Sequence, residues 1–201
     1  MLPPSSNRPA PACPSVDDIA RLVDAPLGRS SVPLRDVALL EILYATGCRT
    51  SEIADLRICD LRQSTCTAIV FGKGMRERIV VYGQPAADAL AAYLRDCRPL
   101  LVGRIEAKPT GPVFLSVAGR RLNRKDIWRI VRKYLAIARL PSCYTTHSLR
   151  HACASHLVAA GADLEIVQRL LGHALISTTS VYLHSDEASR RRVWARAGLN
   201  R

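Results

Sequence analysis

The chain has 201 residues, 48% of them hydrophobic, which is enough for one well-buried domain and only marginally enough for two. No stretch approaches the roughly 20 uninterrupted apolar residues of a membrane span, and the proline-rich start has no apolar segment of a secretory signal, so we expect a cytoplasmic protein without a membrane anchor. The 29 lysines and arginines against 17 acidic residues give a net charge of +12, which favours a polyanionic partner such as nucleic acid over charge that only keeps the protein soluble.

The N-terminal part of the chain predicts a leader followed by two helices. Residues 1–14 are rich in proline, which prevents regular helix, and we expect them to form a disordered leader. Ser15 begins a capping signature with acidic residues in the first turn, so a short helix to about Ala25 is expected. Pro33 suits the first position of a second helix, RDVALLEILYAT, which is apolar almost all round and is therefore predicted to lie at the centre of the core.

Arg49 falls at a predicted break between two helices. Gly47 can adopt the left-handed conformation that ends the second helix. Thr50 or Ser51 can then begin a short helix through Leu56. The side chain of Arg49, lying between the two helices, can be aimed into a cleft.

Two β-like runs follow, TCTAIVF at 65–71 and RERIVVY at 76–82. The turn between them places Lys73 between Gly72 and Gly74, and glycines tolerate the positive φ angles of a hairpin tip. Lys73 is therefore expected to project from a turn rather than to lie within a strand.

The rest of the chain is predicted to be helical apart from one short strand. We expect a helix at 84–97, a loop through Pro112, a strand candidate PVFLS at 112–116, and a helix at 124–140 capped by Asn123. Further helices are expected at 146–160, 164–171, 178–184 and about 186–196. The predicted fold class is mainly α with a small β-hairpin (α+β), in a single domain over residues 15–201.

The stretch THSLRHACASHLVAAGADLEIVQRLLGHALISTTSVY, residues 145–182, carries four chemically active side chains. His147 and Arg150 are three residues apart on a helix and share a face, which we expect to lie beside the core stripe and to border a groove. His173 emerges just past the glycine that stops the following helix, and Tyr182 comes nine residues later.

Two arginines, a lysine, two histidines and a tyrosine suit phosphoryl transfer to tyrosine. Guanidinium groups bind phosphate oxygens with paired hydrogen bonds and stabilise charge that develops in the transition state. A tyrosine hydroxyl has a reference pKa of about 10 and needs a base or a strong field to act as a nucleophile. A histidine can supply the base, and a lysine can protonate the departing oxygen. This chemistry requires no metal ion and no other cofactor.

These residues resemble the catalytic domain of the tyrosine recombinases, the phage integrase family, and most closely its bacterial Xer-type branch. ALLEILYATGCRTSEIADLRICDL is similar to the family's first-arginine box, and GKGMRERIV to its lysine hairpin. THSLRHACASHLVAAGADLEIVQRLLGHALISTTSVYLH is similar to its H-x-x-R, G-H and tyrosine boxes. The intervals also fit, with 24 residues from Arg49 to Lys73 and then 74, 3, 23 and 9 to the later positions.

The resemblance implies a role for each matching residue. Tyr182 resembles the nucleophile that attacks a phosphodiester of double-stranded DNA and forms a 3′-phosphotyrosyl bond. Arg49 and Arg150 resemble the pair that clamps the scissile phosphate. His147 resembles the proton-transfer partner, and Lys73 resembles the general acid for the 5′-hydroxyl. The covalent intermediate retains the bond energy, so the family needs no ATP.

Four further residues are assigned supporting roles. His173 resembles the residue that donates to a nonbridging phosphate oxygen, and Glu52 matches an acid that orients the first arginine. Most of the basic face of the helix at 124–140 is expected to be solvated, and Arg124 and Lys125 are the candidates for contact with the DNA backbone.

His147 and His151 lie four residues apart, as zinc ligands on a helix can. The sequence H-S-L-R-H, however, has arginine where a metalloprotease motif has glutamate, and a guanidinium beside a dication is unfavourable. We therefore predict no metal site and interpret His151 as structural.

Three functions remain open from the sequence. The first is a recombinase that cleaves and rejoins DNA. The second is a DNA-binding remnant or regulator without catalysis, and the third is a DNA-relaxing enzyme like the type IB topoisomerases.

Two features concern assembly. Family members usually carry a separate helical domain before the catalytic one, so we expect the chain to be either a fragment or a member with the catalytic domain alone. Relatives also dock a C-terminal helix on a neighbouring subunit. We expect residues 184–201 to do the same in a tetramer assembled on DNA.

Overall fold

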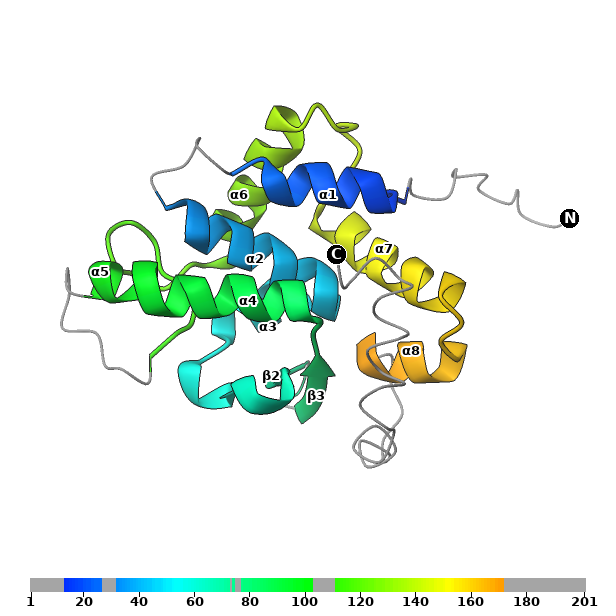
Figure 1. Ribbon diagram of the computed structural model, residues 1–201, viewed down its shortest axis with the longest axis horizontal. Helices are drawn as coiled ribbons and strands as arrows, with labels where there is room; N and C mark the ends of the chain where they lie inside the picture. The colour runs from blue at the N-terminus through cyan, green and yellow to red at the C-terminus, as the bar shows by residue number, and fades with distance from the viewer. Residues whose placement is uncertain (1–12, 27–31, 73, 75–76, 103–110, 172–201) are drawn as a thin grey trace, which may run out of the picture.

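The computed structural model describes residues 13–26, 32–72, 74, 77–102 and 111–171, and Figure 1 shows their arrangement. The elements are α1 (Val16–Asp24), α2 (Pro33–Thr46), α3 (Thr50–Asp55), η1 (Ile58–Asp60), β1 (Leu61–Arg62), η2 (Gln63–Thr65), β2 (Thr67–Phe71), β3 (Glu77–Val81), α4 (Gln84–Ala92), η3 (Tyr93–Cys97), α5 (Arg98–Val102), α6 (Arg124–Ile137), α7 (Thr146–Ala159) and α8 (Leu164–Leu171). The predicted class, mainly α with a small antiparallel sheet, is confirmed.

Helix α2 lies at the centre of the core, as its apolar sequence predicted. Every residue from Ala38 to Thr46 is buried, and the helix packs against α1, α4 and α7. In Figure 1, α4 runs across α2, while α7 and α8 lie at the end of α2 where it meets α3. A helix that is apolar all round must be covered on every side, because exposed apolar surface costs free energy.

Capping residues set the helix boundaries where the sequence placed them. Ser15 forms a capping box with Asp18 at the start of α1, and Asn123 accepts hydrogen bonds from the first turn of α6. Thr145 caps α7 in the same way, and its side chain accepts from the backbone N–H groups of His147 and Ser148. These caps satisfy backbone donors that have no partner inside the helix.

The sheet has three antiparallel strands in the order β1-β2-β3. Thr67 pairs with Val81 and Phe71 pairs with Glu77, so β2 and β3 form the predicted hairpin, although both strands are shorter than expected. The two-residue strand β1 was not predicted. The hairpin lies beneath α2 and α4 in Figure 1.

The predicted strand PVFLS is wrong. Residues 112–116 make only isolated bridges, between Arg57 and Pro112 and between Leu115 and Arg121. The buried Tyr93 hydroxyl takes the place of a neighbouring strand, since it donates to the carbonyl oxygen of Val113 at 3.0 Å and accepts from the N–H of Leu115 at 3.2 Å.

The helix predicted at 84–97 continues to Val102. Its middle part, η3, is a turn of π-helix that ends at Cys97, two residues before Pro99. Proline has no N–H and its ring collides with the carbonyl group one turn earlier. A locally widened turn is one way in which a helix passes such a residue, and the sequence pattern alone did not reveal it.

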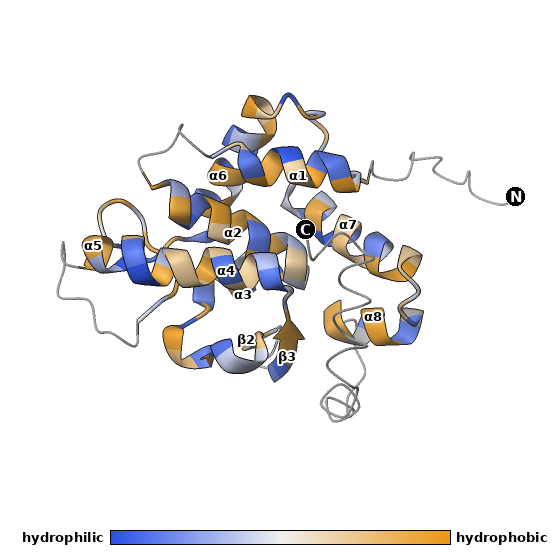
Figure 2. Ribbon diagram, in the orientation of Figure 1, coloured by the Kyte–Doolittle hydropathy of each residue, from blue (hydrophilic) through white to orange (hydrophobic). Residues whose placement is uncertain are grey.

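The outer helices α1 and α6 alternate hydrophobic and hydrophilic residues along their length (Figure 2). On α6, Ile127, Val131, Tyr134 and Leu135 are buried, which confirms most of the predicted stripe, while Ile130 and Ala138 are partly buried. Within the described ranges, none of the helices is long and apolar enough to cross a membrane.

Candidate active site

The junction between α2 and α3 brings the first arginine box to the middle of α7 and the last residue of α8. Gly47 ends α2 with a φ of 57°, the predicted left-handed conformation, and α3 begins at Thr50. A Cβ atom on Gly47 would lie 2.4 Å from Cδ2 of Leu171 and 3.4 Å from Sγ of Cys153. Glycine therefore serves both the turn and the close approach of α7 and α8.

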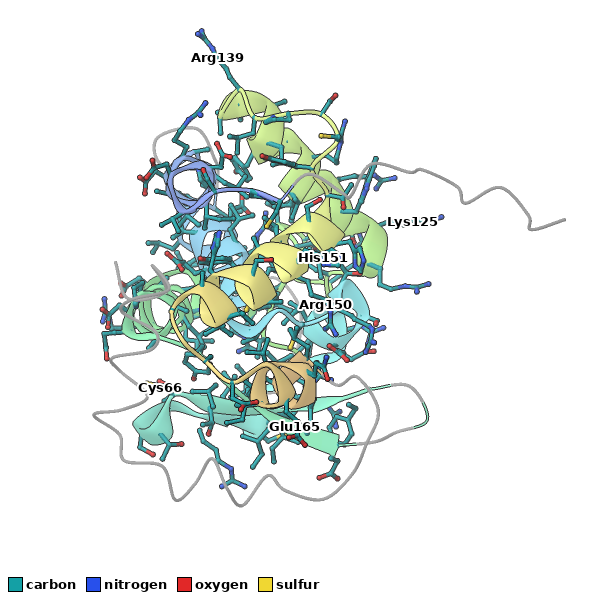
Figure 3. All side chains as sticks on the ribbon, turned by 90° about the vertical axis from the view of Figure 1, so that its right-hand side faces the viewer. Cys66, Lys125, Arg139, Arg150, His151 and Glu165 are labelled. Carbon is teal, nitrogen blue, oxygen red and sulfur yellow. The ribbon has the colours of Figure 1, made fainter. Side chains whose placement is uncertain are left out.

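Arg150 is buried on α7 and is held by two backbone carbonyl groups. Its Nη1 donates to the carbonyl oxygen of Gly47 at 2.6 Å, and its Nη2 donates to the carbonyl oxygen of Leu171. Only 6% of the residue is exposed, so Arg150 is more deeply buried than the predicted position beside the core, facing a groove, implied. Burial of the cation, together with the charges of Arg49 and Arg78, lowers the pKa of Arg150. Figure 3 shows Arg150 on α7, with α8 directly below it.

Glu52 supplies the carboxylate of this site. Its Oε2 accepts from the backbone N–H of Arg49 at 2.7 Å, and its Oε1 accepts from Arg49 Nη1 at 3.2 Å. The expected pairing of Glu52 with Arg49 is therefore present. Burial alone would raise the pKa of Glu52, but the hydrogen bonds from Arg78 and Arg49 outweigh it and hold this pKa below its ordinary value.

Arg78 is a site residue that sequence reasoning did not single out. Its Nη1 and Nη2 donate to the two carboxylate oxygens of Glu52 at 2.7 and 2.8 Å, and its Nε donates to the carbonyl oxygen of Leu170 at 3.0 Å. A signal was present in the sequence, because side chains two apart on a strand share a face. Arg78 shares the face of the buried Val80, where a charge requires a partner.

The described part of the site holds more positive than negative charge. The charges of Arg49 and Arg78 lie close enough to act on Arg150, and Glu52 is an acid that accepts hydrogen bonds from Arg49 and Arg78. No ion pair joins Arg150 to a carboxylate among the residues that the structure describes. Buried charges are normally paired, so the cluster is suited to binding an anion.

His147 is exposed at the start of α7, one turn before Arg150. Its Nε2 lies 3.0 Å from Nε2 of His151, and the two rings meet edge to face with centroids 4.4 Å apart. His151 is therefore a hydrogen-bond partner of a predicted catalytic residue. His156 instead bonds the buried Tyr44 hydroxyl through Nδ1 at 2.8 Å, as a structural histidine would.

The sequence matches the phage integrase family over residues 15–189. This chain belongs to that family. It is 40% identical to the tyrosine recombinase XerD of Chlorobaculum tepidum over 92% of this chain and 61% of that protein. It is 37% identical to XerD of Halalkalibacterium halodurans over 96% of this chain and 63% of that protein. The chain thus spans about three fifths of the length of these curated relatives.

Solved recombinase structures share the fold. The crystal structure of XerA recombinase superposes with a TM-score of 0.72 and 28% identity, covering 97% of this chain and 66% of that one. The XerH site-specific recombinase bound to its palindromic difH substrate, a post-cleavage complex, superposes with a TM-score of 0.68 and 25% identity, covering 92% of this chain and 53% of that one. The resemblance to the Xer-type recombinases is therefore confirmed.

In this integrase-family chain, the structure brings Arg49, Glu52 and Arg150 together. The predicted residues Lys73, His173 and Tyr182, together with the tail at 184–201, lie outside the described residues. These assignments stay predictions.

The remaining candidates lie on α6. Arg124 and Lys125 are exposed in its first turn, and Figure 3 shows Lys125 extending away from the body of the protein. Among the described residues, no group of three or more histidine, cysteine or acidic side chains is arranged to hold a metal ion.

Proposed function

We propose that this chain is the catalytic part of a site-specific DNA recombinase that cuts and rejoins strands through a 3′-phosphotyrosyl intermediate. The observation that carries the proposal is the arginine cluster, in which the buried Arg150 lies beside Arg49 and Arg78, and the latter two bind the carboxylate of Glu52. A phosphodiester anion would supply the missing negative charge. Membership of a family whose relatives are tyrosine recombinases supports the same function.

Arg150 and Arg49 would bind the scissile phosphate in different ways. Arg150 has five N–H donors, and the Gly47 and Leu171 carbonyl groups engage two of them, which leaves the others to bind nonbridging oxygens. These carbonyl bonds fix the plane of the guanidinium before the DNA arrives, and preorganised donors stabilise developing charge at little reorganisation cost. The side chain of Arg49 is 46% exposed, so a ligand can reach it while Glu52 accepts hydrogen bonds from its backbone N–H and Nη1.

In the proposed step, the Tyr182 hydroxyl attacks the phosphorus and the bond to the 5′ oxygen breaks. The tyrosine proton passes to His147, directly or through a water, and Lys73 protonates the departing 5′ oxygen, which leaves as a hydroxyl. Arg49, Arg150 and His173 donate to the nonbridging oxygens. A second 5′-hydroxyl then reverses the step on a new strand, which rejoins the DNA without ATP or a metal ion.

The partner in this proposal is double-stranded DNA, to which the +12 net charge is suited. We extend it to a tetramer assembled on DNA, with residues 184–201 docking on a neighbouring subunit, acting in the cytoplasm where the chromosome lies. Size measurement of the protein on a DNA containing two sites, with and without residues 184–201, tests the assembly. A complex whose size does not depend on those residues would contradict docking by the tail.

The chemistry is tested with nicked duplexes that trap the covalent intermediate, carrying random sequence and the flanks of the protein's own gene. The wild-type protein should form an adduct that survives denaturation, and sequencing the trapped DNA would give the site. Tyr182→Phe removes the nucleophile and should abolish the adduct while retaining DNA binding. Binding by the wild type without any adduct would instead indicate a regulator, and plasmid relaxation without strand exchange would indicate an enzyme like the type IB topoisomerases.

A further inference from the structure

Arg78 joins three elements of the site from one strand position. It lies on β3, its side chain is only 12% exposed, and its guanidinium contacts Glu52 on α3 and the Leu170 carbonyl on α8. Its Nη2 also lies 3.8 Å from Sγ of Cys48. The hydrogen bond to Glu52 raises the pKa of Arg78 even though burial opposes its charge, so the group stays protonated.

Through Glu52, Arg78 also restrains the position of Arg49. Arg78 engages both oxygens of the Glu52 carboxylate in a two-pronged pair, which fixes the plane of that carboxylate. The same oxygens accept the backbone N–H and the Nη1 of Arg49. The side chain of Arg49 is 46% exposed and that of Arg78 only 12%, so Arg78 is the partner that holds the buried Glu52 carboxylate in place.

Arg78 also holds the last turn of α8. The final carbonyl groups of a helix have no partner within it. Arg78 binds that of Leu170, and Arg150 binds that of Leu171, so two arginines from different elements cap this helix end. In the sequence, His173 follows Leu171 by two residues, and Lys73 precedes Arg78 by five. The contacts of Arg78 thus join the strand after the lysine turn to the helix before the predicted catalytic histidine.

We propose that Arg78 is a positioning residue for strand cleavage, which holds Arg49 through Glu52 and holds the end of α8 through Leu170, without itself contacting DNA. This rests on the proposed recombinase function. A displacement of about 1 Å in a catalytic group can lower a rate by about 10²-fold, so the loss of this hold should be visible in the chemical step rather than in binding.

The test compares Arg78→Lys and Arg78→Met with the control Arg62→Met, which removes an exposed arginine from β1, the other edge strand of the same sheet. Single-turnover adduct formation at saturating nicked DNA should fall about 10- to 100-fold for both Arg78 variants, as for other supporting residues, and should be unchanged for the control. The dissociation constant for DNA should change less than about threefold, since Arg78 does not contact DNA in this proposal and the side chains that bind phosphate remain. Lysine keeps the charge but cannot form the two-pronged pair with Glu52, so Arg78→Lys should form the adduct little faster than Arg78→Met.

A measurement that does not depend on cleavage tests the positioning role of Arg78 separately from the proposed recombinase function. Amide hydrogen exchange in 50–55 and 164–171 should rise in Arg78→Met, while exchange in α6 should stay as in the wild type. Glu52→Gln should lower the cleavage rate similarly, and adding Arg78→Met to it should lower the rate little further.

Each adverse result has its own meaning. An Arg78→Met protein with unchanged exchange and a wild-type rate overturns the positioning role. Affinity that falls as much as the rate shows that Arg78 contacts DNA. A wild type that forms no Tyr182-dependent adduct refutes the recombinase function, while the exchange data still decide whether Arg78 holds α3 and α8.

Discussion

The carbonyl oxygen of Gly47 accepts a hydrogen bond from Nη1 of Arg150 at 2.6 Å, although the two residues are 103 positions apart in the chain. The left-handed turn that ends α2 therefore also orients the buried arginine of α7. Fold and site share this contact, so a change at Gly47 should affect both.

Gly47→Ala should destabilise the protein and reduce cleavage. Alanine in the left-handed conformation costs roughly 1–2 kcal/mol. The new Cβ would also lie 2.4 Å from the side chain of Leu171, the residue whose backbone carbonyl accepts a hydrogen bond from Arg150. The matched control is Gly161→Ala, where φ is 91° but no atom lies within 4 Å of the new Cβ. Thermal unfolding and adduct formation check both variants. A larger loss of melting temperature or of cleavage in Gly161→Ala than in Gly47→Ala would contradict the role of the Leu171 contact.

Glu52→Gln should make stability less dependent on pH. The folded-state pKa of Glu52 is depressed from its ordinary value of 4.5, so its stabilising contribution is present above that value and is lost as pH falls through the folded-state pKa. The free energy of unfolding of the wild type should therefore exceed that of Glu52→Gln at pH 7, and the difference should shrink below about pH 4.5. Denaturant unfolding from pH 7 to pH 3 measures it. A difference that grows on acidification would contradict the assigned ion pairs.

The sequence predicted the interactions between residues that are close together in the chain better than those between distant residues. The caps at Ser15 and Asn123 are local, and each was predicted from a few neighbouring residues. The bonds from Arg78 to Glu52 and to Leu170 span 26 and 92 positions, and no periodicity in a single sequence encodes them. Burial of Arg150 was missed for the same reason, since its carbonyl partners belong to other elements.

Arg124→Ala and Lys125→Ala should each weaken DNA binding with little dependence on sequence. Both side chains are exposed in the first turn of α6, and removing a side chain that binds one phosphate should reduce the salt slope of log affinity by about one. Arg95→Ala is the control, because it removes one positive charge that is exposed and already paired with Asp96. Binding titrations at several salt concentrations give the slopes. Equal slopes for all three variants would remove α6 from the DNA interface.

His151→Ala should slow cleavage through His147, without a comparable loss of DNA affinity. The Nε2 atoms of the two rings lie 3.0 Å apart, so one ring must donate its N–H and the other must accept through an unprotonated nitrogen. This bond couples the tautomers of the two rings and restrains the orientation of His147, which a proton-transfer group needs. We expect about a tenfold slower single-turnover reaction, at the lower limit of the effect of supporting residues.

Two variants give this last prediction its control and its contradiction. His151→Gln retains a side chain that can donate and accept, so it should keep more activity than His151→Ala. Ser155→Ala alters an exposed residue one turn further along α7 and should leave the rate unchanged. A wild-type rate in His151→Ala would show that the pair contributes only to the helix surface.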